Sequence, residues 1–296
     1  MSQPSSQFVV SGTVAATDPV ARSETPGADA FDIAALSPAS RVRRLREGFR
    51  IASWDHPARL SESSQDALYA RLIKVSTRAF GADMTPYWRD RRAGGYFQQL
   101  SRFVLLMTDD NVVVGWTGFH RKRFGGRRCL FLDSTGVVPE LQARGLMRPL
   151  QARLLWRELR RHPWAPTYVL ARTESPVVYK ALRELVGGPT YPAPHVTVPE
   201  TVRAIAADAS AWLGQTAGFE PQTLTIRDAY SNLDALYGEL PQSTDGELNR
   251  FMQALLRPQD AMVFVGRTSI YAALQAELAQ RNRHPVRTKS ESQSPA

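Results

Sequence analysis

The sequence predicts a mixed α/β (α+β) domain in which strands and helices alternate. The apolar runs Phe103 to Met107 and Val112 to Phe119 are separated by Asp109-Asp110-Asn111, which is typical of a β-hairpin. From Ser61 to Phe80, apolar residues instead recur every three to four positions, as in an amphipathic helix. A chain of 296 residues can hold one large domain or two small ones.

The other elements are predicted in order along the chain. A helix at 86–100 has an interruption at Gly94-Gly95, and a helix from Val177 to Val186 has Ser175 as its cap, Pro176 in its first turn and Gly187 after its end. Further strands are expected at 49–54, 129–138, 167–171, 222–226 and 262–265, and further helices after residue 147, at 199–213 and at 270–278.

Composition shifts divide the chain. Residues 1–45 are rich in Ser, Ala, Thr and Pro and predict a disordered tail, since they bury too little apolar surface to offset the ordering entropy. We expect the domain at 46–267, with an insertion at about 189–258. Residues 268–296 are expected to form a C-terminal helix and a polar tail.

Several classes of protein do not fit the composition. A single cysteine, Cys129, rules out a disulfide framework, and five scattered histidines have no metal-ligand spacing, so no metal site is expected. No apolar run is long enough to span a membrane, and the N-terminus does not resemble a secretory signal, so we expect a cytoplasmic protein with no membrane contact. The formal net charge of +9 suits acidic partners such as CoA phosphates, although the charges can also be spread over a solvated surface.

The most informative segment is a strand, a tight turn and a helix between Asp133 and the residues after Met147. The turn leaves backbone N–H groups at a helix N-terminus, where the helix dipole favours an anion. Gly145 permits a close backbone approach, and Arg144 can add a bidentate phosphate contact. This layout predicts a phosphate-binding loop.

The spacing in this segment resembles the acetyl-CoA loop of the GCN5-related N-acetyltransferase (GNAT) superfamily. Val137-Val138-Pro139 is followed at the expected offset by Gln142-Ala143-Arg144-Gly145-Leu146-Met147, and Met147 departs from the small residue of the family pattern. The predicted element order over residues 49–187 is also the GNAT order. The resemblance implies a central mixed, mostly antiparallel sheet flanked by helices, with a helical insertion before the last strands. It also implies that acetyl-CoA, as co-substrate, contacts Val137, Val138, Gln142, Ala143, Arg144, Gly145, Leu146 and Met147.

Two residues are candidates for the chemistry. Asp133 lies four residues before Val137, where many GNAT members place a carboxylate that acts as the base. The alternative is a structural carboxylate that is paired to Arg128 or Arg172. Tyr179 is the candidate general acid, by resemblance to a tyrosine that reaches the CoA sulfur. The alternative is a packing residue at helical spacing with Leu182 and Val186.

The function predicted from these residues is an acetyl-CoA-dependent N-acetyltransferase that acts on a primary amine of unknown identity, either a small molecule or a protein. The alternative is a GNAT-fold module with weak or no catalysis that works through protein contacts. Nucleic-acid binding through the basic segments 41–46, 121–128 and 153–161 is less favoured, because they lack interleaved aromatic residues. A homodimer is compatible with the sequence.

Overall fold

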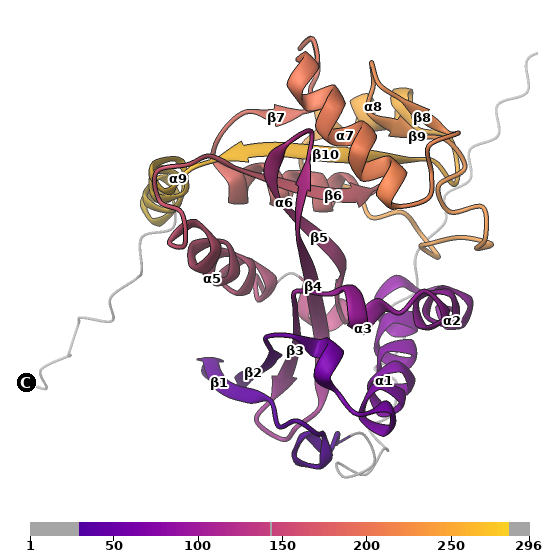
Figure 1. The fold of residues 1–296 in the computed structure, drawn as a ribbon, viewed down its shortest axis with the longest axis vertical. Helices are drawn as coiled ribbons and strands as arrows, with labels where there is room; N and C mark the ends of the chain where they lie inside the picture. The colour runs from indigo at the N-terminus through magenta and orange to yellow at the C-terminus, as the bar shows by residue number, and fades with distance from the viewer. Residues whose placement is uncertain (1–29, 143, 284–296) are drawn as a thin grey trace, which may run out of the picture.

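A computed structural model describes residues 30–142 and 144–283. Within these ranges one ten-stranded sheet runs through the molecule in the order β1-β2-β3-β4-β5-β6-β10-β9-β8, and β7 also pairs with β10 (Figure 1). The pairing is antiparallel except between β5 and β6, which are parallel. The fold class predicted from the sequence, a mixed and mostly antiparallel sheet flanked by helices, is confirmed.

The strands are β1 (Arg41–Arg46), β2 (Phe49–Trp54), β3 (Arg102–Thr108), β4 (Val113–Phe124), β5 (Arg127–Val137), β6 (Thr167–Thr173), β7 (Thr190–Tyr191), β8 (Phe219–Glu220), β9 (Thr225–Ile226) and β10 (Ala261–Thr268). The α-helices are α1 (Glu62–Phe80), α2 (Thr85–Ala93), α3 (Tyr96–Gln99), α4 (Pro139–Gln142), α5 (Met147–Leu159), α6 (Pro176–Val186), α7 (Glu200–Trp212), α8 (Gly246–Leu255) and α9 (Ile270–Arg283). Two short 3₁₀ helices precede α1, at Ile33–Ala35 and Pro57–Arg59. None of the described helices is both long and apolar enough to cross a membrane.

The predicted helix ends are confirmed by their capping groups. The Ser61 hydroxyl accepts a hydrogen bond from the Ser64 N–H at the start of α1, and the Ser175 hydroxyl accepts one from Val178 at the start of α6. The predicted interruption in the second helix also appears, because Gly94-Gly95 separates α2 from α3.

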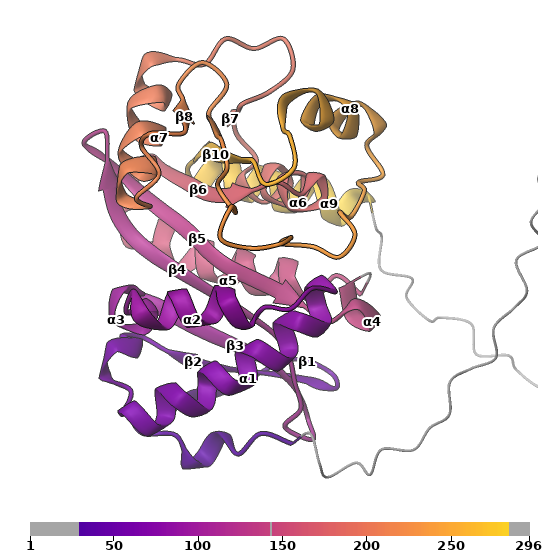
Figure 2. The ribbon, with the colours of Figure 1, turned by 90° about the vertical axis from the view of Figure 1, so that its right-hand side faces the viewer.

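The two faces of the sheet carry different helices, and β4 shows the division. Trp116 and His120 face one side, where Trp116 packs on α1 and α2 and His120 packs on Trp212 of α7. Arg121 points to the other side, where it pairs with Glu158 of α5. Helices α5, α6 and α9 pack together there. Figure 2 shows α2 and α7 on one side of the long strands and α5 behind them.

The structure describes part of the segment for which the sequence predicts a disordered tail. Residues 41–46 form edge strand β1, which pairs with β2, and Ala30 pairs with Val112. Phe31, Leu36 and Leu45 are buried, so this segment docks through few apolar anchors and many backbone hydrogen bonds. Composition hides such a strand, since its arginines are exposed and its pairing uses the backbone. Residues 1–29 of the predicted tail lie outside the described residues.

The segment between α6 and β10 contributes strands to the sheet and also contacts the first helices. The strands expected at 222–226 and 262–265 are present as β9 and β10, which pair antiparallel. Between β9 and α8 the chain leaves the sheet and reaches the end of α1, where the Gly238 N–H donates to the Phe80 carbonyl at 2.9 Å. In Figure 2 this orange segment passes between α6 and α1.

Candidate active site

The strands β5 and β6 separate at the centre of the sheet. Their parallel pairing runs from Cys129 and Tyr168 to Leu132 and Ala171, whereas β5 continues to Val137. The residues that follow the last pair are Asp133 and Arg172, so both lie where the strands begin to diverge. An opening between parallel strands exposes backbone groups that a continuous sheet would satisfy.

A bulge in β5 accompanies this separation. Ser134 has a φ of 48°, in the left-handed region, and the pairing with β4 shifts register between Trp116 and Gly118. The Trp116 indole N–H donates to the Ser134 hydroxyl at 3.0 Å. The ring also covers Gly136, where a Cβ would lie 2.3 Å from a ring carbon, so only glycine fits.

The backbone after the bulge turns one amide toward the opening. The Val138 N–H donates to the Val114 carbonyl of β4 at 2.9 Å. Because neighbouring residues of an antiparallel strand alternate in direction, the Val137 N–H points away from β4, toward the side from which β6 has separated. The Val137 carbonyl accepts the Gln142 side-chain amide at 3.0 Å, which ties the strand end to the following turn.

The turn that is predicted to bind phosphate contains a glycine with a positive φ and precedes an uncapped helix. Gly145 has a φ of 62°, and a Cβ there would meet no atom within 4 Å. Helix α5 begins at Met147, and no side chain caps its N-terminus. Its first N–H groups are therefore available to an anion. Arg144 is exposed and forms no ion pair with a described residue, while Ala143 lies outside the described residues.

The long side chain of Met147 does not fill this turn. Met147 is partly buried and packs against the hydrophobic core, and Leu146 beside it is buried. The departure from the family pattern at Met147 thus leaves the backbone of the loop open.

Asp133 is not in the surroundings of a general base. Its carboxylate receives Arg91 Nη1 at 2.6 Å on Oδ2 and Arg91 Nη2 at 2.8 Å on Oδ1, and His120 Nε2 lies 3.0 Å from Oδ2. Burial raises the pKa of Asp133, but Arg91 and His120 outweigh burial and hold this pKa well below its usual range. These contacts match the structural alternative considered from the sequence, a paired carboxylate, and the role of Asp133 as the base stays a prediction.

The partner of Asp133 also differs from both arginines considered from the sequence, Arg128 and Arg172. Arg91 comes from α2, whose Trp88 packs on Trp116 of β4 and donates its indole N–H to Ser76 of α1 at 2.7 Å. This packing fixes α2 above β5, so Arg91, three residues after Trp88, reaches the carboxylate.

Tyr179 is a core residue, which matches the packing alternative considered from the sequence, and its role as the general acid stays a prediction. Its side chain is 1% exposed, its ring packs on Phe264 with centroids 5.3 Å apart, and its hydroxyl donates to the Pro192 carbonyl. Burial raises the pKa of Tyr179. Among the described residues it lines neither of the two cavities beside the opening.

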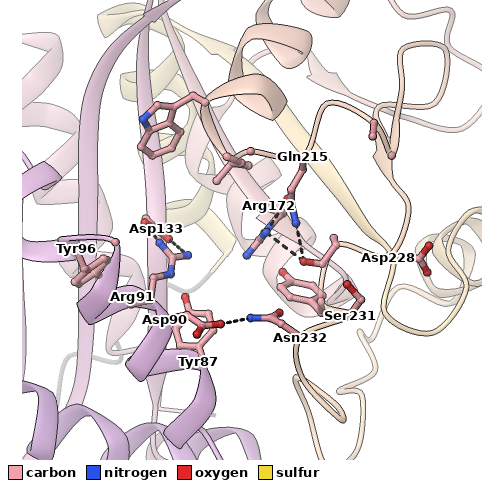
Figure 3. Close-up of a pocket in the computed structure, with 18 of the residues that line it drawn as sticks. Tyr87, Asp90, Arg91, Tyr96, Asp133, Arg172, Gln215, Asp228, Ser231 and Asn232 are labelled. Carbon is pink, nitrogen blue, oxygen red and sulfur yellow. Dashed lines mark hydrogen bonds and ion pairs between the residues drawn. The ribbon is translucent and has the colours of Figure 1, made fainter.

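A polar cavity of about 540 Å³, here called the Asp133 pocket, lies against the point where β5 and β6 separate (Figure 3). Arg91 and Asp133 form one wall and Arg172 the facing wall. The Arg172 guanidinium lies over the ring of Tyr230, which also lines the pocket. Asp90 of α2 accepts a hydrogen bond from the Asn232 side chain, which joins the two walls. The residues of the second wall come from 212–232, a stretch far from α2 in sequence.

Glu174 is a candidate that sequence reasoning missed. It follows β6 and lines a second cavity of about 360 Å³ together with apolar residues such as Leu236 and Met252. Burial raises the pKa of Glu174 to about 7, and Arg172 opposes this rise. A carboxyl group with this pKa can exchange a proton near neutrality. No sequence signal marks Glu174, because its apolar surroundings come from residues 234–257, which are distant from it in the sequence.

The basic segments considered for nucleic-acid binding use several of their arginines within the molecule. Arg121 pairs with Glu158 at 2.6 Å, and both Arg41 and Arg157 pair with Asp55. These pairs join separate elements of the fold and reduce the charge available to an acidic partner.

Comparison with known proteins gives matches in structure. No protein-family model matches the chain, and no curated protein matches it in sequence. Among solved structures, the ribosomal-protein-S18-alanine N-acetyltransferase from Escherichia coli aligns with 75% of this chain and 95% of its own, at 13% identity and a TM-score of 0.39. A GNAT family N-acetyltransferase from Escherichia coli in complex with CoA aligns with 48% of this chain and 68% of its own, at 18% identity and a TM-score of 0.30.

A GNAT family acetyltransferase from Brucella melitensis, in complex with acetyl-CoA, aligns with 40% of this chain and 74% of its own, at 19% identity and a TM-score of 0.28.

Proposed function

We propose that the protein is an acetyl-CoA-dependent N-acyltransferase that transfers an acetyl group to a primary amine, either a small molecule or a protein amine. One observation carries the proposal: the opening between β5 and β6 leads directly into the loop at Gly145 and the uncapped start of α5. Acetyl-CoA would place its phosphates at the helix N-terminus and its extended acyl arm along the strand edge. Binding it in this way needs the strand opening and the free helix start together.

The residues of the loop fit the pyrophosphate of acetyl-CoA. The backbone N–H groups at Gly145, Leu146 and Met147 and the exposed guanidinium of Arg144 would hold it, in accord with the helix dipole. Val137 would present its N–H to the acyl arm, while Gln142 holds the Val137 carbonyl in place. When bound, acetyl-CoA supplies an acetyl group that is already activated as a thioester.

The remaining groups would act on the amine. The Asp133 pocket would admit the acceptor where β5 and β6 separate. The ion pair of Asp133 with Arg91 would hold α2 against β5. Glu174 is our candidate to accept the proton that an ammonium group must lose before it attacks; because Glu174 lines the second cavity, the proton would have to pass to it from the Asp133 pocket. Tyr179 would support α6 from the core.

Two measurements test this proposal. Calorimetric titration with acetyl-CoA should give saturable binding, and an amine panel should release CoA thiol in the presence of an accepted amine. Absence of acetyl-CoA binding by the folded protein at millimolar concentration would remove the proposed function.

A second candidate function is a GNAT-fold module with weak or no catalysis that works through protein contacts. The observation that favours it is the position of Tyr237, which packs edge-on against Phe80 at the end of α1 and interacts with Ser175 at the start of α6. This side chain comes close to the end of β6, near the path that an acyl arm would take. The same titration separates the two candidates.

A further inference from the structure

Arg172 is held rigidly on the wall of the Asp133 pocket. Its Nη1 donates to the Gln215 side chain at 2.7 Å and to the Ala229 carbonyl at 3.4 Å, and its guanidinium lies over the Tyr230 ring at 4.6 Å. Nη1 is thus engaged by hydrogen bonds and one face of the guanidinium by the ring, which leaves one edge of the guanidinium free.

The free edge of Arg172 consists of Nε and Nη2. Among the described residues neither nitrogen has a hydrogen-bond partner, and neither is a buried unpaired atom, so both are open to the pocket. In Figure 3 the guanidinium extends from Gln215 toward the middle of the pocket and faces Arg91 and Asp133. These two parallel N–H groups match the two oxygens of a carboxylate.

The other arginines that line the Asp133 pocket are already neutralised. Arg91 is paired with Asp133, and Arg227 is paired with Glu220 at 2.7 Å and with Asp260 at 2.5 Å. Arg172 is the one arginine of this lining that has no described carboxylate within 4.0 Å.

The acidic residues nearby do not replace such a partner. Glu174 interacts with Arg172 at longer range, and burial raises its pKa to about 7, so it carries only part of a negative charge at neutral pH. Asp90 and Asp228 also line the pocket, but neither lies within 4.0 Å of the Arg172 guanidinium, and Asp90 accepts a hydrogen bond from Asn232. The fixed cation thus faces the cavity without a described carboxylate in contact with it.

We propose that Arg172 binds the carboxylate of the acceptor, so that the amines acetylated at this site are amino acids or other small amines that carry a carboxylate close to the amino group. This inference rests on the proposed function and deepens it. The position of Arg172 limits the spacing, because its neighbour Ala171 forms the last β5–β6 pair and the amine must react where the strands separate.

The pocket favours a carboxylate over a larger anion. One guanidinium edge satisfies one carboxylate, whereas a phosphate or a polyanion would need further cations, and the other arginines are engaged. Asp90 and Asp228 on the same lining would repel additional negative charge. A cavity of about 540 Å³ can hold a molecule of amino-acid size.

The first test is specificity at constant side chain. Each common amino acid is compared with its carboxamide, in which the amine remains and the charge is lost. For accepted side chains we expect kcat/KM for the amino acid to exceed that of the amide at least about tenfold, which corresponds to about 1.4 kcal/mol. Equal or higher values for the amides, together with clear acetyl-CoA turnover, would overturn the inference and leave the proposed function intact.

The second test uses variants and does not require catalysis. Arg172→Gln removes the charge, and Arg172→Lys retains it. Binding of N-acetyl amino acids, followed by calorimetry without CoA, should weaken at least about tenfold in R172Q and less in R172K. Acetyl-CoA affinity should be the same in both variants as in the unaltered protein. If folded R172Q binds these carboxylates as tightly as the unaltered protein does, the role of Arg172 is overturned. If the unaltered protein does not bind acetyl-CoA, the proposed function is overturned instead.

Discussion

Asp133 of β5 and Arg91 of α2 form a two-pronged ion pair, with nitrogen–oxygen distances of 2.6 and 2.8 Å, across 42 residues of sequence. The Asp133 carboxylate is 4% exposed, and the His120 ring closes its remaining side. The pair joins the first helical layer to the strand that separates from β6. The carboxylate expected to be the base is therefore a structural anchor of the candidate site.

Asp133→Asn should destabilise the protein. The substitution removes the buried partner of Arg91, whose own side chain is partly exposed, so the cost should fall below the value of about 3–5 kcal/mol for a fully buried pair. Urea unfolding measures this loss. The double variant Asp133→Asn/Arg91→Gln should recover part of it, because neither charge remains buried alone. If Asp133→Asn keeps the stability of the unaltered protein but lowers turnover, the result would instead support Asp133 as the base.

Gly145→Glu should abolish acetyl-CoA binding, and Gly145→Lys should reduce it much less. Both side chains enter open space and share the cost of a positive φ, so their stabilities should match within about 1 kcal/mol. They differ in the charge beside the uncapped start of α5. Calorimetry gives the affinities, and equal values for Glu and Lys at position 145 would contradict an anion site at this turn.

Tyr179→Phe should lower stability and leave turnover unchanged. The variant removes the hydrogen bond to the buried Pro192 carbonyl, which costs about 1–3 kcal/mol, while the ring contact with Phe264 remains. Thermal unfolding and a CoA-release assay measure the two effects separately. A hundredfold fall in turnover at native stability would show that Tyr179 acts in the chemistry.

Glu174→Gln should change the pH dependence of stability. The pKa of Glu174 is about 7 in the folded protein, above the ordinary value of 4.5, so the folded state binds the extra proton between these values. The contribution is full below pH 4.5 and is lost as the pH rises through 7, with a slope of at most about 1.4 kcal/mol per pH unit. Urea titrations from pH 4.5 to 8 should show this slope in the unaltered protein and a smaller slope in the variant.

The same variant tests Glu174 as the proton acceptor. On a confirmed amine, Glu174→Gln should reduce turnover at pH 7 by about 10²–10⁴-fold, with acetyl-CoA affinity unchanged. The loss should shrink at high pH, where the free amine is abundant. If turnover at pH 7 stays at the unaltered level, the amine must lose its proton without Glu174.

Removal of β1 should destabilise the protein. A chain that starts at Glu47 loses the hydrogen bonds between β1 and β2 together with the buried side chains of Phe31, Leu36 and Leu45, so the comparison measures the whole segment 30–46. A chain that starts at Ala30 keeps every described contact and serves as the control. We expect a melting temperature several degrees lower for the shorter chain, since 1 kcal/mol shifts it by roughly 2–4 °C at this size. Equal melting temperatures would show that β1 adds nothing to stability.

The sequence by itself determined the order of elements and the turn at Gly145. Helix caps such as Ser61 and Ser175, and a glycine at positive φ, act over a few residues, so local patterns reveal them. Which residues meet at the candidate site depends on the tertiary structure. Arg91, Arg172 and Glu174 acquire their roles from α2, residues 212–232 and residues 234–257, which meet only after the sheet has formed. Local patterns do not reveal the burial of Tyr179 or the ion pair of Asp133 with Arg91, because both depend on neighbours that are distant in the chain.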